Sequence, residues 1–379
     1  MTKTTRKELL SAIKQRYLKA TREEKTEILN EFCKSTGYNR LYAIRILQAG
    51  HQYRSWTRKR PSTYSPELLL LIIKLWELLD YPCGTRLKPQ LLPLTESLVR
   101  SGELPEVSES WQRQLRKISA KTLDRRLKRE RIIRRLKKNR GATRHGSLLK
   151  SSIPIRITNW DTRRIGFMEM DTVAHCGDQL AGDFIYSLDM VEIATGWSEQ
   201  IAVMGKGEAG IVTAIEAIKQ GLPFDLKGLD SDTGSEFVNW HMVRWCKENN
   251  LSFTRSRPYY KNDNAYVEQK NYTHIRRWLG YRRYDAQTQL QMINDLYRNE
   301  LRQFNNFFRP VMKITSKEKV NNSVCKKKYG QALTPYQRLM HSNQIPPKTK
   351  SALQKLYESL NPVKLKEAIE AKLKRILGS

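Results

Sequence analysis

Features that would define several protein classes are missing from this sequence. Its five cysteines are dispersed, with no Cys-x-x-Cys pair and no histidine pair at zinc-finger spacing, which argues against a structural zinc site. The longest apolar run, residues 68–79, contains Lys74 and Glu77 and is too short to cross a bilayer. The first residues pass directly into a charged helical pattern rather than a signal peptide. We therefore expect a protein of the reducing cytoplasm with no membrane association.

Acidic side chains are also scarce: 38 aspartates and glutamates face 69 lysines and arginines, a formal net charge of +31. Residues 111–150 contain sixteen basic and two acidic side chains, whereas residues 161–250 carry a net negative charge. Basic ends suit the phosphates of a polyanion, and an acidic centre would repel those phosphates unless cations intervened. A ribosomal or architectural nucleic-acid binder would account for the basic ends but not for the acidic centre.

The first sixty residues have the pattern of a helical module. Periodicity predicts a helix up to residue 20, a second that stops near Gly37, and a third over residues 39–48. The third helix leaves Arg40 and Arg45 on its outer face. Helix, short turn and basic helix are typical of a helix-turn-helix that contacts DNA, and a plain helical hairpin is the alternative.

Residues 61–136 predict a second helical module, which opens with an apolar helix capped by Ser65. Its last helix, residues 120–136, follows another short turn, and its pattern places Leu123, Leu127, Ile132 and Ile133 inward. The basic side chains that remain for phosphates or base edges are Lys121, Arg125, Arg126 and Arg129. A solvated run of charge is the alternative interpretation.

Residues 137–160 lack periodicity and are interpreted as a basic linker. Beyond them the pattern changes to strands and helices. Three β-rich runs come first, and helices then alternate with strands, which predicts an α/β order with mixed strand directions. The expected strands are 166–174, 184–193, 197–204, 226–232 and 252–256, and the expected helices are 209–220, 236–249 and 264–279.

Three carboxylates in this region stand where they can converge. Asp171 lies within an apolar strand, Asp232 follows another strand after sixty intervening residues, and Glu268 lies on a later helix after thirty-five more. Hard oxygen ligands in a small cluster suit Mg²⁺ or Mn²⁺. Two such ions can activate a nucleophile and stabilise the leaving oxygen of a phosphodiester. Each acid alone would be an ordinary surface carboxylate.

Four segments carry a family resemblance: FMEMDTVAH, LDMVEIATGWSE, LDSDTGSEF and RPYYKNDNAYVEQKN. They resemble the integrase-type catalytic core of DDE transposases and retroviral integrases, and are most similar to bacterial insertion-sequence transposases. The resemblance covers roughly residues 160–285. The motif around Asp232 is SDTG where TDNG is common in the family, so Thr233 replaces the usual asparagine. The zinc module of retroviral integrases is missing.

The resemblance implies a fold and a site. The fold would be an α/β RNase H-like core, a mixed five-stranded sheet with flanking helices, preceded by all-α helix-turn-helix modules. Asp171, Asp232 and Glu268 would be the catalytic residues and the ligands of two Mg²⁺ or Mn²⁺ ions. The implied domains are 1–60 and 61–136 for DNA binding, 137–160 as linker, 161–285 as catalytic core and 286–379 as a helical and basic region.

The implied function is that of a DNA transposase. The helical modules would bind the terminal inverted repeats of an element, and the core would cleave the ends and transfer 3′-hydroxyl strands into target DNA. Double-stranded DNA would be the partner, within a homo-oligomeric synaptic complex at the nucleoid. The alternatives are a domesticated DNA-binding regulator without catalysis, and a retroelement integrase or RNase H-like nuclease.

Further polar residues near the three carboxylates have expected roles. Asp230 and Glu169 share a strand face with Asp232 and Asp171 respectively, which makes them candidates to support the site. Asp263 is expected to cap the helix of Glu268. His175 is not expected to be a ligand. DNA contacts are expected at the strand end and along that helix, at Arg257, Lys261, Lys270 and Arg276.

Overall fold

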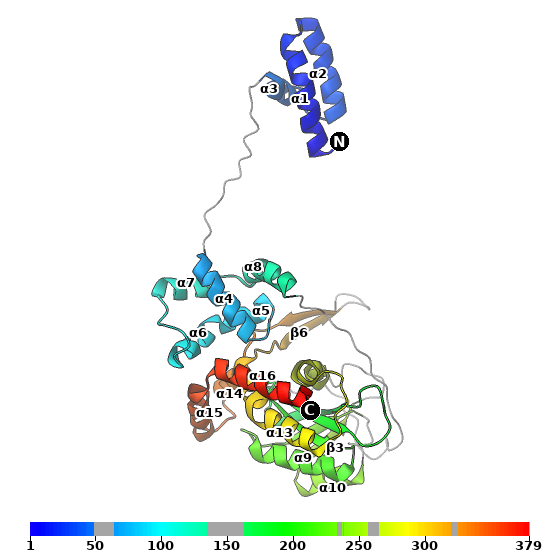
Figure 1. Ribbon diagram of the computed structural model, residues 1–379, viewed down its shortest axis with the longest axis vertical. Helices are drawn as coiled ribbons and strands as arrows, with labels where there is room; N and C mark the ends of the chain where they lie inside the picture. Colours follow the sequence, from blue (N-terminus) through cyan, green and yellow to red (C-terminus); the bar gives the residue numbers. More distant parts are fainter. Residues whose placement is uncertain are drawn as a thin grey trace. The chain divides into compact units, whose positions relative to one another are not determined.

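The computed structural model describes residues 1–48, 64–134, 163–232, 237, 239–256, 265–319 and 325–378. Contacts divide the chain into two compact units, residues 1–63 and residues 64–379. Figure 1 shows the helices of the first unit in blue, and the remaining elements belong to the second unit.

The first unit is a small helical bundle built from α1 (Lys3–Lys19), α2 (Arg22–Thr36) and α3 (Arg40–Gln48). Thr21 and Glu24 form a capping box at the start of α2. Gly37 ends α2 with a φ of 70°, a left-handed conformation that glycine adopts at little cost. Phe32 and Leu47 lie in the core between the helices.

The second unit begins with helices that the apolar pattern of residues 64–134 predicts. Ser65 accepts the backbone N–H of Leu68, and Pro66 occupies the first turn of the first helix, as their sequence positions indicate. The elements are α4 (Pro66–Leu78), α5 (Gly84–Leu87), η1 (Lys88–Gln90), α6 (Leu91–Arg100), α7 (Glu109–Lys117) and α8 (Ala120–Ile133).

Helix α8 buries less of its surface than its sequence pattern predicts. Leu123 and Leu127 are buried, but Ile132 and Ile133 are 68% and 60% exposed, so the inward position expected for these isoleucines is wrong. The helix packs on α5 near its own N-terminus, where the Gly84 amide donates to Asp124 at 2.9 Å. The apolar side chains in the first half of α8 are therefore buried, whereas its last turn extends beyond the contact with α5.

A five-stranded sheet forms the centre of the second unit. Its strands are β1 (Phe167–Ala174), β2 (Ile185–Glu192), β3 (Ser198–Met204), β4 (Gly228–Ser231) and β5 (Ser252–Arg255). They lie in the order β3-β2-β1-β4-β5. The first three strands pair antiparallel, and β4 and β5 join in parallel. Antiparallel strands that follow one another along the chain can be joined by turns, whereas the parallel strands β4 and β5 each follow a helix that crosses the sheet.

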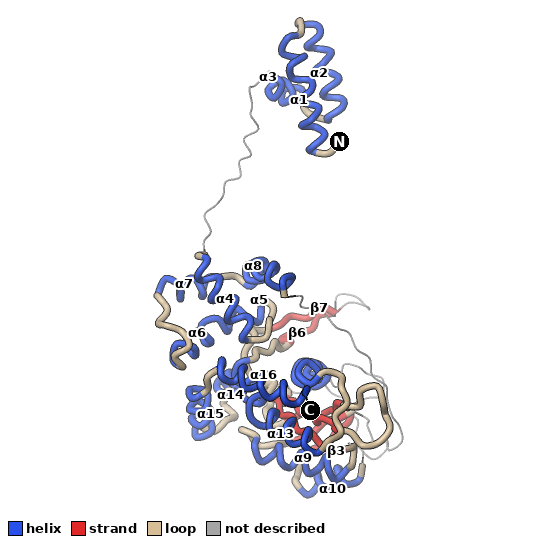
Figure 2. The backbone as a smooth tube through the Cα atoms, in the orientation of Figure 1, coloured by secondary structure: helices blue, strands red, loops and turns tan. Residues whose placement is uncertain are grey.

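Helices cover both faces of the sheet (Figures 1 and 2). On one face, α9 (Glu208–Gly221) and α10 (Trp240–Glu248) pack on the methionines of β1, Met168 and Met170. Because side chains alternate along a strand, Glu169 and Asp171 point to the opposite face. That face carries a helix made of α11 (Ala265–Lys270), a π-helical segment η2 (Asn271–Arg276) and α12 (Arg277–Leu279).

This sheet order with these strand directions, flanked by helices on both faces, is an RNase H-like fold. The fold class predicted from the sequence, including the helical region before the core, is therefore confirmed. Among the described helices, none is long and apolar enough to span a membrane.

Helices and a two-stranded antiparallel sheet follow the five-stranded sheet along the chain. The elements are α13 (Gln287–Leu296), η3 (Tyr297–Leu301), η4 (Phe304–Phe308), β6 (Ile314–Lys319), β7 (Cys325–Tyr329), α14 (Pro335–His341), α15 (Pro347–Ser359) and α16 (Pro362–Gly378). Strands β6 and β7 pair antiparallel in a sheet of their own.

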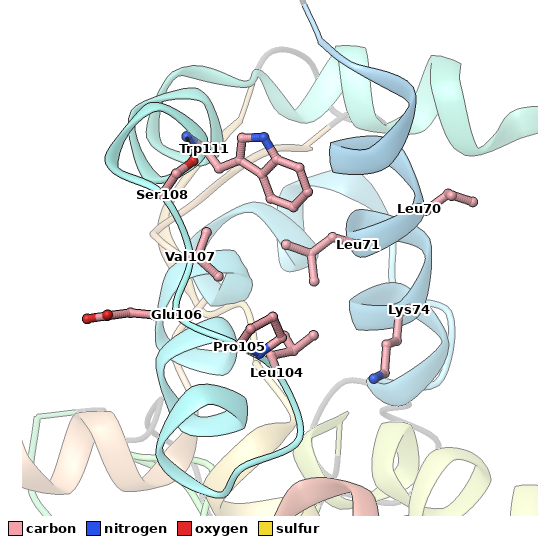
Figure 3. A pocket seen from close by; sticks show the side chains of 9 residues that line it. All are labelled: Leu70, Leu71, Lys74, Leu104, Pro105, Glu106, Val107, Ser108 and Trp111. Carbon is pink, nitrogen blue, oxygen red and sulfur yellow. Dashed lines mark hydrogen bonds between the residues drawn. The ribbon is translucent and has the colours of Figure 1, made fainter.

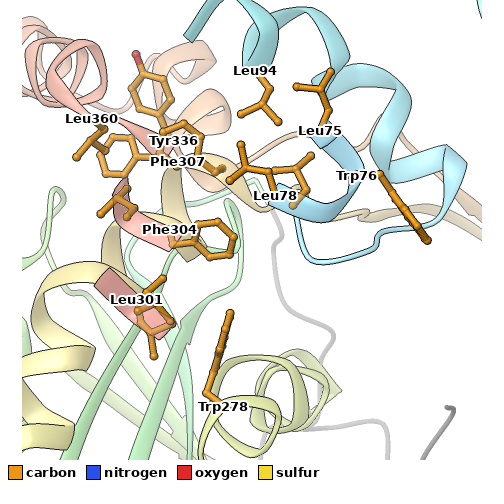
Figure 4. Close-up of a cluster of buried hydrophobic side chains, with 14 of the residues drawn as sticks. Leu75, Trp76, Leu78, Leu94, Trp278, Leu301, Phe304, Phe307, Tyr336 and Leu360 are labelled. Carbon is orange, nitrogen blue, oxygen red and sulfur yellow. The ribbon is translucent and has the colours of Figure 1, made fainter. Parts of the chain in front are cut away.

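One hydrophobic core connects the early helices with the late ones (Figure 4). Leu75 of α4 and Leu94 of α6 belong to the same buried cluster as Phe304 of η4 and Leu360 after α15. The helices of residues 64–134 therefore share a core with the C-terminal helices. The domain limits expected from the sequence stay predictions.

Candidate active site

Two of the three predicted carboxylates meet where β4 ends. Met170 of β1 pairs in parallel register with Ser231 of β4, so the next residues, Asp171 and Asp232, lie at the same level on neighbouring strands. The pKa of Asp171 is raised to about 8, first because the carboxyl group is buried and next because the Asp232 charge is close. The strand order thus brings together two acidic residues that have sixty residues between them in the sequence.

Helix α11 brings Glu268 to the same region. Asn271 donates its side-chain N–H to Asp171 Oδ2 at 2.6 Å. Glu268 lies three residues before Asn271, a spacing that puts the two side chains next to each other on a helix surface, and its own side chain is exposed. The π-helical segment η2 begins at Asn271, and such segments are frequent at functional sites. Sequence reasoning missed Asn271, although its spacing from Glu268 could have indicated it.

Within the described part of the chain, no three histidine, cysteine or acidic side chains gather closely enough to form a metal-binding group. The donor set nevertheless fits a hard divalent cation. Asp171 and Asp232 offer carboxylate oxygens, and their mutual repulsion, seen in the raised pKa of Asp171, would be relieved by a cation between them. Asn271 Oδ1 is a buried oxygen without a hydrogen-bond partner among the described residues.

Glu169 and Asp230 form a second acidic layer on the same face. They are register partners on β1 and β4, and both are fully buried. Glu169 Oε2 accepts the backbone N–H groups of Tyr266 at 2.9 Å and Val267 at 3.2 Å. Asp230 accepts the hydroxyl of Thr254 from β5. Both residues therefore lie two positions before the Asp171–Asp232 pair on the same face, and Glu169 holds the start of α11.

A buried polar row continues across the sheet on the other side of Asp171. Asp189 of β2 is the register partner of Asp171 and accepts the side-chain N–H of Gln200 at 2.8 Å. Burial raises the pKa of Asp189 to about 7. Burial also lowers the pKa of Lys270 to about 7, while the nearby Asp189 raises it. The sequence interpretation did not single out Gln200.

The expected DNA contacts on the helical modules lie on exposed surfaces. Arg40 and Arg45 are exposed on α3, and the residues predicted on α8, Lys121, Arg125, Arg126 and Arg129, are exposed as well. Arg45 also lies over the ring of Tyr42, with 5.3 Å between the guanidinium carbon and the ring centroid. Their contact with DNA stays a prediction.

The expected contacts along the helix of Glu268 have other surroundings. Lys270 is 7% exposed and its Nζ lies 3.4 Å from His274 Nε2, so it faces the interior rather than a phosphate backbone. Arg276 donates to the carbonyl of Ala174 at 2.7 Å, which ties the helix to the end of β1. The exposed position predicted for Lys270 is therefore wrong, and the DNA contact of Arg276, which is half-buried, stays a prediction. Arg257 and Lys261 lie outside the described residues.

His175 lies in a buried hydrogen-bonded environment. It is fully buried, its Nε2 lies 2.8 Å from the hydroxyl of Ser187, and that hydroxyl lies 2.7 Å from the hydroxyl of Tyr297. Burial lowers the pKa of His175 to about 3, so the ring is neutral. The cap expected from Asp263 lies outside the described residues.

A separate hollow of about 590 Å³ lies among the early helices (Figure 3). Its lining is mainly apolar, with Leu71, Val107 and Trp111 facing one another across it. Lys74 and Glu106 are the charged residues of the lining. This hollow contains a single carboxylate, Glu106, so the candidate catalytic groups are the carboxylates on the sheet.

The fold and the acidic pair define an RNase H-like α/β protein with a candidate acidic active site on its central strands. No family model matches the chain. The uncharacterized protein y4rM of Sinorhizobium fredii (strain NBRC 101917 / NGR234) is 36% identical over 324 residues, which are 85% of this chain and 92% of y4rM. The chain belongs to the same family as y4rM.

Among solved structures, the catalytic core domain of BIV integrase aligns with 45% of this chain and 91% of that domain. The sequence identity is 16% and the TM-score is 0.30. A likeness at this score carries no argument about function. The fold assignment comes instead from the order and directions of the strands.

Proposed function

We propose that the chain is a DNA transposase of the DDE type, a metal-dependent polynucleotidyl transferase and endonuclease. It binds the terminal inverted repeats of its element, cleaves phosphodiester bonds at the ends, and joins the freed 3′-hydroxyls to target DNA. The observation that carries the proposal is the meeting of Asp171 and Asp232 on adjacent strands of an RNase H-like sheet, under the helix that bears Glu268.

The catalytic residues of the proposal are Asp171, Asp232 and Glu268. They would hold two Mg²⁺ or Mn²⁺ ions, which when bound lower the pKa of an attacking water and stabilise the leaving oxygen of a phosphodiester. Asn271 orients the Asp171 carboxylate through the 2.6 Å hydrogen bond to Oδ2. The other oxygen of this carboxylate, Oδ1, accepts the backbone N–H of Thr172, the next residue of β1.

The basic surfaces of the proposal bind DNA. Exposed arginines on α3 and α8 suit phosphate contacts and base edges. The acidic sheet edge would repel DNA without cations, so binding by basic helices and cleavage at the carboxylates are separable. A synaptic complex of two DNA ends would require a homo-oligomer.

A supercoiled plasmid that carries the DNA flanking the gene tests the proposal. We expect nicking at the element ends and strand transfer with Mg²⁺ or Mn²⁺, because carboxylates are ligands for hard cations. Chelation should abolish both reactions, and re-addition of Mn²⁺ should restore them. Full activity after exhaustive chelation would contradict the proposed site.

The second candidate function is DNA binding without catalysis. The exposed arginines of α3 and α8 favour it, because basic side chains can bind DNA phosphates without a metal site. Such a regulator would bind the flanking repeats with the same affinity in the presence and absence of divalent cations, and would leave the plasmid intact.

A further inference from the structure

Glu169 is a buried carboxylate that the proposed chemistry does not use. It lies on β1 two residues before Asp171 and is fully buried. Its Oε2 accepts two backbone N–H groups, from Tyr266 at 2.9 Å and Val267 at 3.2 Å. These are among the first N–H groups of α11, which have no carbonyl partner within the helix.

The contact is a helix cap provided from far along the chain. A carboxylate at a helix N-terminus satisfies the unpaired N–H groups and interacts favourably with the helix dipole. Here the carboxylate comes from a strand 97 residues before Tyr266, so it joins the helix to the sheet as well as capping it. Hydrogen bonds to an ionised acceptor are stronger than those between neutral groups.

A second bond from the same strand fixes the rotation of the helix. Asp171 accepts from Asn271 at 2.6 Å, one turn after Glu268. Glu268 is therefore placed between two attachment points, Glu169 at the helix start and Asp171 beyond it. Both points belong to one strand, so moving the helix start changes the distance of Glu268 from Asp171 and Asp232.

A lysine lies beside this arrangement. The ammonium group of Lys313 is 5.6 Å from the ring centroid of Tyr266, and it donates to the carbonyl of Ala194 at 2.6 Å. Glu169 is one of the two carboxylates whose charge acts on Lys313, the other being Glu192. The ammonium group of Lys313 is therefore a positive charge close to the contact between Glu169 and α11.

We propose that Glu169 is a positioning residue, which docks the N-terminus of α11 on β1 and so sets where Glu268 stands relative to Asp171 and Asp232. This inference rests on the proposed function. Glu169 does not bind the ions or DNA in this proposal, and its effect reaches the site through α11.

Three substitutions in the full chain test the inference. Glu169→Ala removes both acceptor bonds, and Glu169→Gln keeps one side-chain carbonyl oxygen at the same volume. Glu192→Gln is the matched control, because Glu192 is also fully buried and also accepts two neighbouring backbone N–H groups, from Ala194 at 3.0 Å and Thr195 at 2.6 Å. Those two residues form a turn after β2 rather than the start of α11.

The first measurement is Mn²⁺ binding by calorimetry. Outer residues that orient metal ligands typically change metal affinity 10- to 100-fold. We expect Glu169→Ala to raise the Mn²⁺ dissociation constant by about that factor, Glu169→Gln to raise it less, and Glu192→Gln to leave it at the wild-type value. Wild-type Mn²⁺ affinity in both Glu169 variants would overturn the inference.

The second measurement is deuterium uptake of peptides that cover residues 265–270. Uptake should rise in Glu169→Ala and remain at the wild-type level in Glu192→Gln. Unchanged uptake in both Glu169 variants would overturn the inference that Glu169 holds the start of α11. If Glu169→Ala does not fold, Glu169→Gln decides through the same two readouts.

The proposed function fails in a different way. A wild-type chain that binds no Mn²⁺, or an Asp232→Asn variant that binds it normally, would contradict the proposed metal site. Deuterium uptake over residues 265–270 would still decide whether Glu169 holds the helix.

Discussion

At the level of single side chains, the acidic face of the sheet is organised in two layers. Asp171 and Asp232 form the outer layer, where burial and, next, the neighbouring Asp232 charge raise the pKa of Asp171 to about 8. Glu169 and Asp230 form the inner layer, where hydrogen bonds from α11 and β5 satisfy them. The pair in which two negative charges are crowded together is suited to a cation, and the pair held by hydrogen bonds from α11 and β5 is suited to a structural role.

Asp232→Asn separates these layers experimentally. The change keeps the volume of the side chain but removes the charge that raises the pKa of Asp171, so stability in chelated buffer should hold or rise. Nicking and strand transfer should both collapse, because one carboxylate cluster serves both steps, while affinity for repeat DNA stays near wild type. A plasmid nicking and strand-transfer assay beside a gel-shift measurement checks this.

Asp230→Asn is the control for that experiment. Asp230 lies two residues earlier on the same face but accepts from Thr254, so most activity should remain. An active Asp232→Asn together with an inactive Asp230→Asn would show that the catalytic aspartate has been assigned to the wrong layer.

At the level of elements, α8 is divided along its length between packing and an exposed basic surface. Leu123 and Leu127 bury its first half against α5 and the shared core. Arg125, Arg126 and Arg129 are exposed along the same helix. A helix that buries one narrow stripe and exposes arginines on the remainder is available to a nucleic-acid groove or backbone.

The double substitution Arg125→Ala, Arg126→Ala tests that surface. Each lost phosphate contact reduces counterion release, so the slope of log affinity against log salt should become shallower by roughly one per contact. Fluorescence anisotropy with repeat DNA at several salt concentrations measures the slope.

Arg113→Ala with Arg116→Ala on α7 removes the same charge from another exposed helix. We expect this control to change the slope less. Equal slopes for both double variants would indicate attraction by net charge, and an unchanged slope in the α8 variant would show that α8 does not meet DNA.

At the level of the second unit, the helical region and the sheet are joined by charge as well as by the shared core. Asp80 follows α4 in a left-handed conformation, with a φ of 66°. Its carboxylate accepts from Arg277 of α12 at 2.6 Å and lies 3.8 Å from Arg309. One buried acid thus connects the early helices to the helix that continues from Glu268.

The stability of this unit should depend on pH through its buried histidines. Burial lowers the pKa of His175 from 6.5 to about 3 and that of His274 well below 6.5, so each ring is neutral in the folded chain. Below pH 6.5 the unfolded chain binds more protons than the folded chain. The stabilisation is therefore complete above pH 6.5 and is lost as pH falls toward 3.

Urea unfolding at pH 4.5 to 7 measures this dependence. His175→Gln should lose less stability than wild type on acidification, by up to about 1.4 kcal/mol per pH unit. His241→Gln, whose side chain is 64% exposed in the wild type, is the control and should follow the wild-type slope. A His175 variant with the wild-type slope would show that this histidine is not the titrating group.

Local patterns were enough to predict the order of the strands and helices and the spacing of Asp171, Asp232 and Glu268. Hydrophobic periodicity, capping residues and glycine act over a few neighbours, so they can be read along the chain. The same local reasoning misplaced Ile132 and Ile133, because whether the last turn of a helix is buried depends on the length of the element it packs against.

The functional geometry required the tertiary structure. Glu169 caps a helix 97 residues away, Asn271 reaches a strand 100 residues away, and Lys270 is buried rather than exposed. Each outcome depends on which helix lies on which face of the sheet and at what register. Burial and hydrogen bonding between distant segments are properties of the assembled layers, and the spacing of residues along the chain does not contain them.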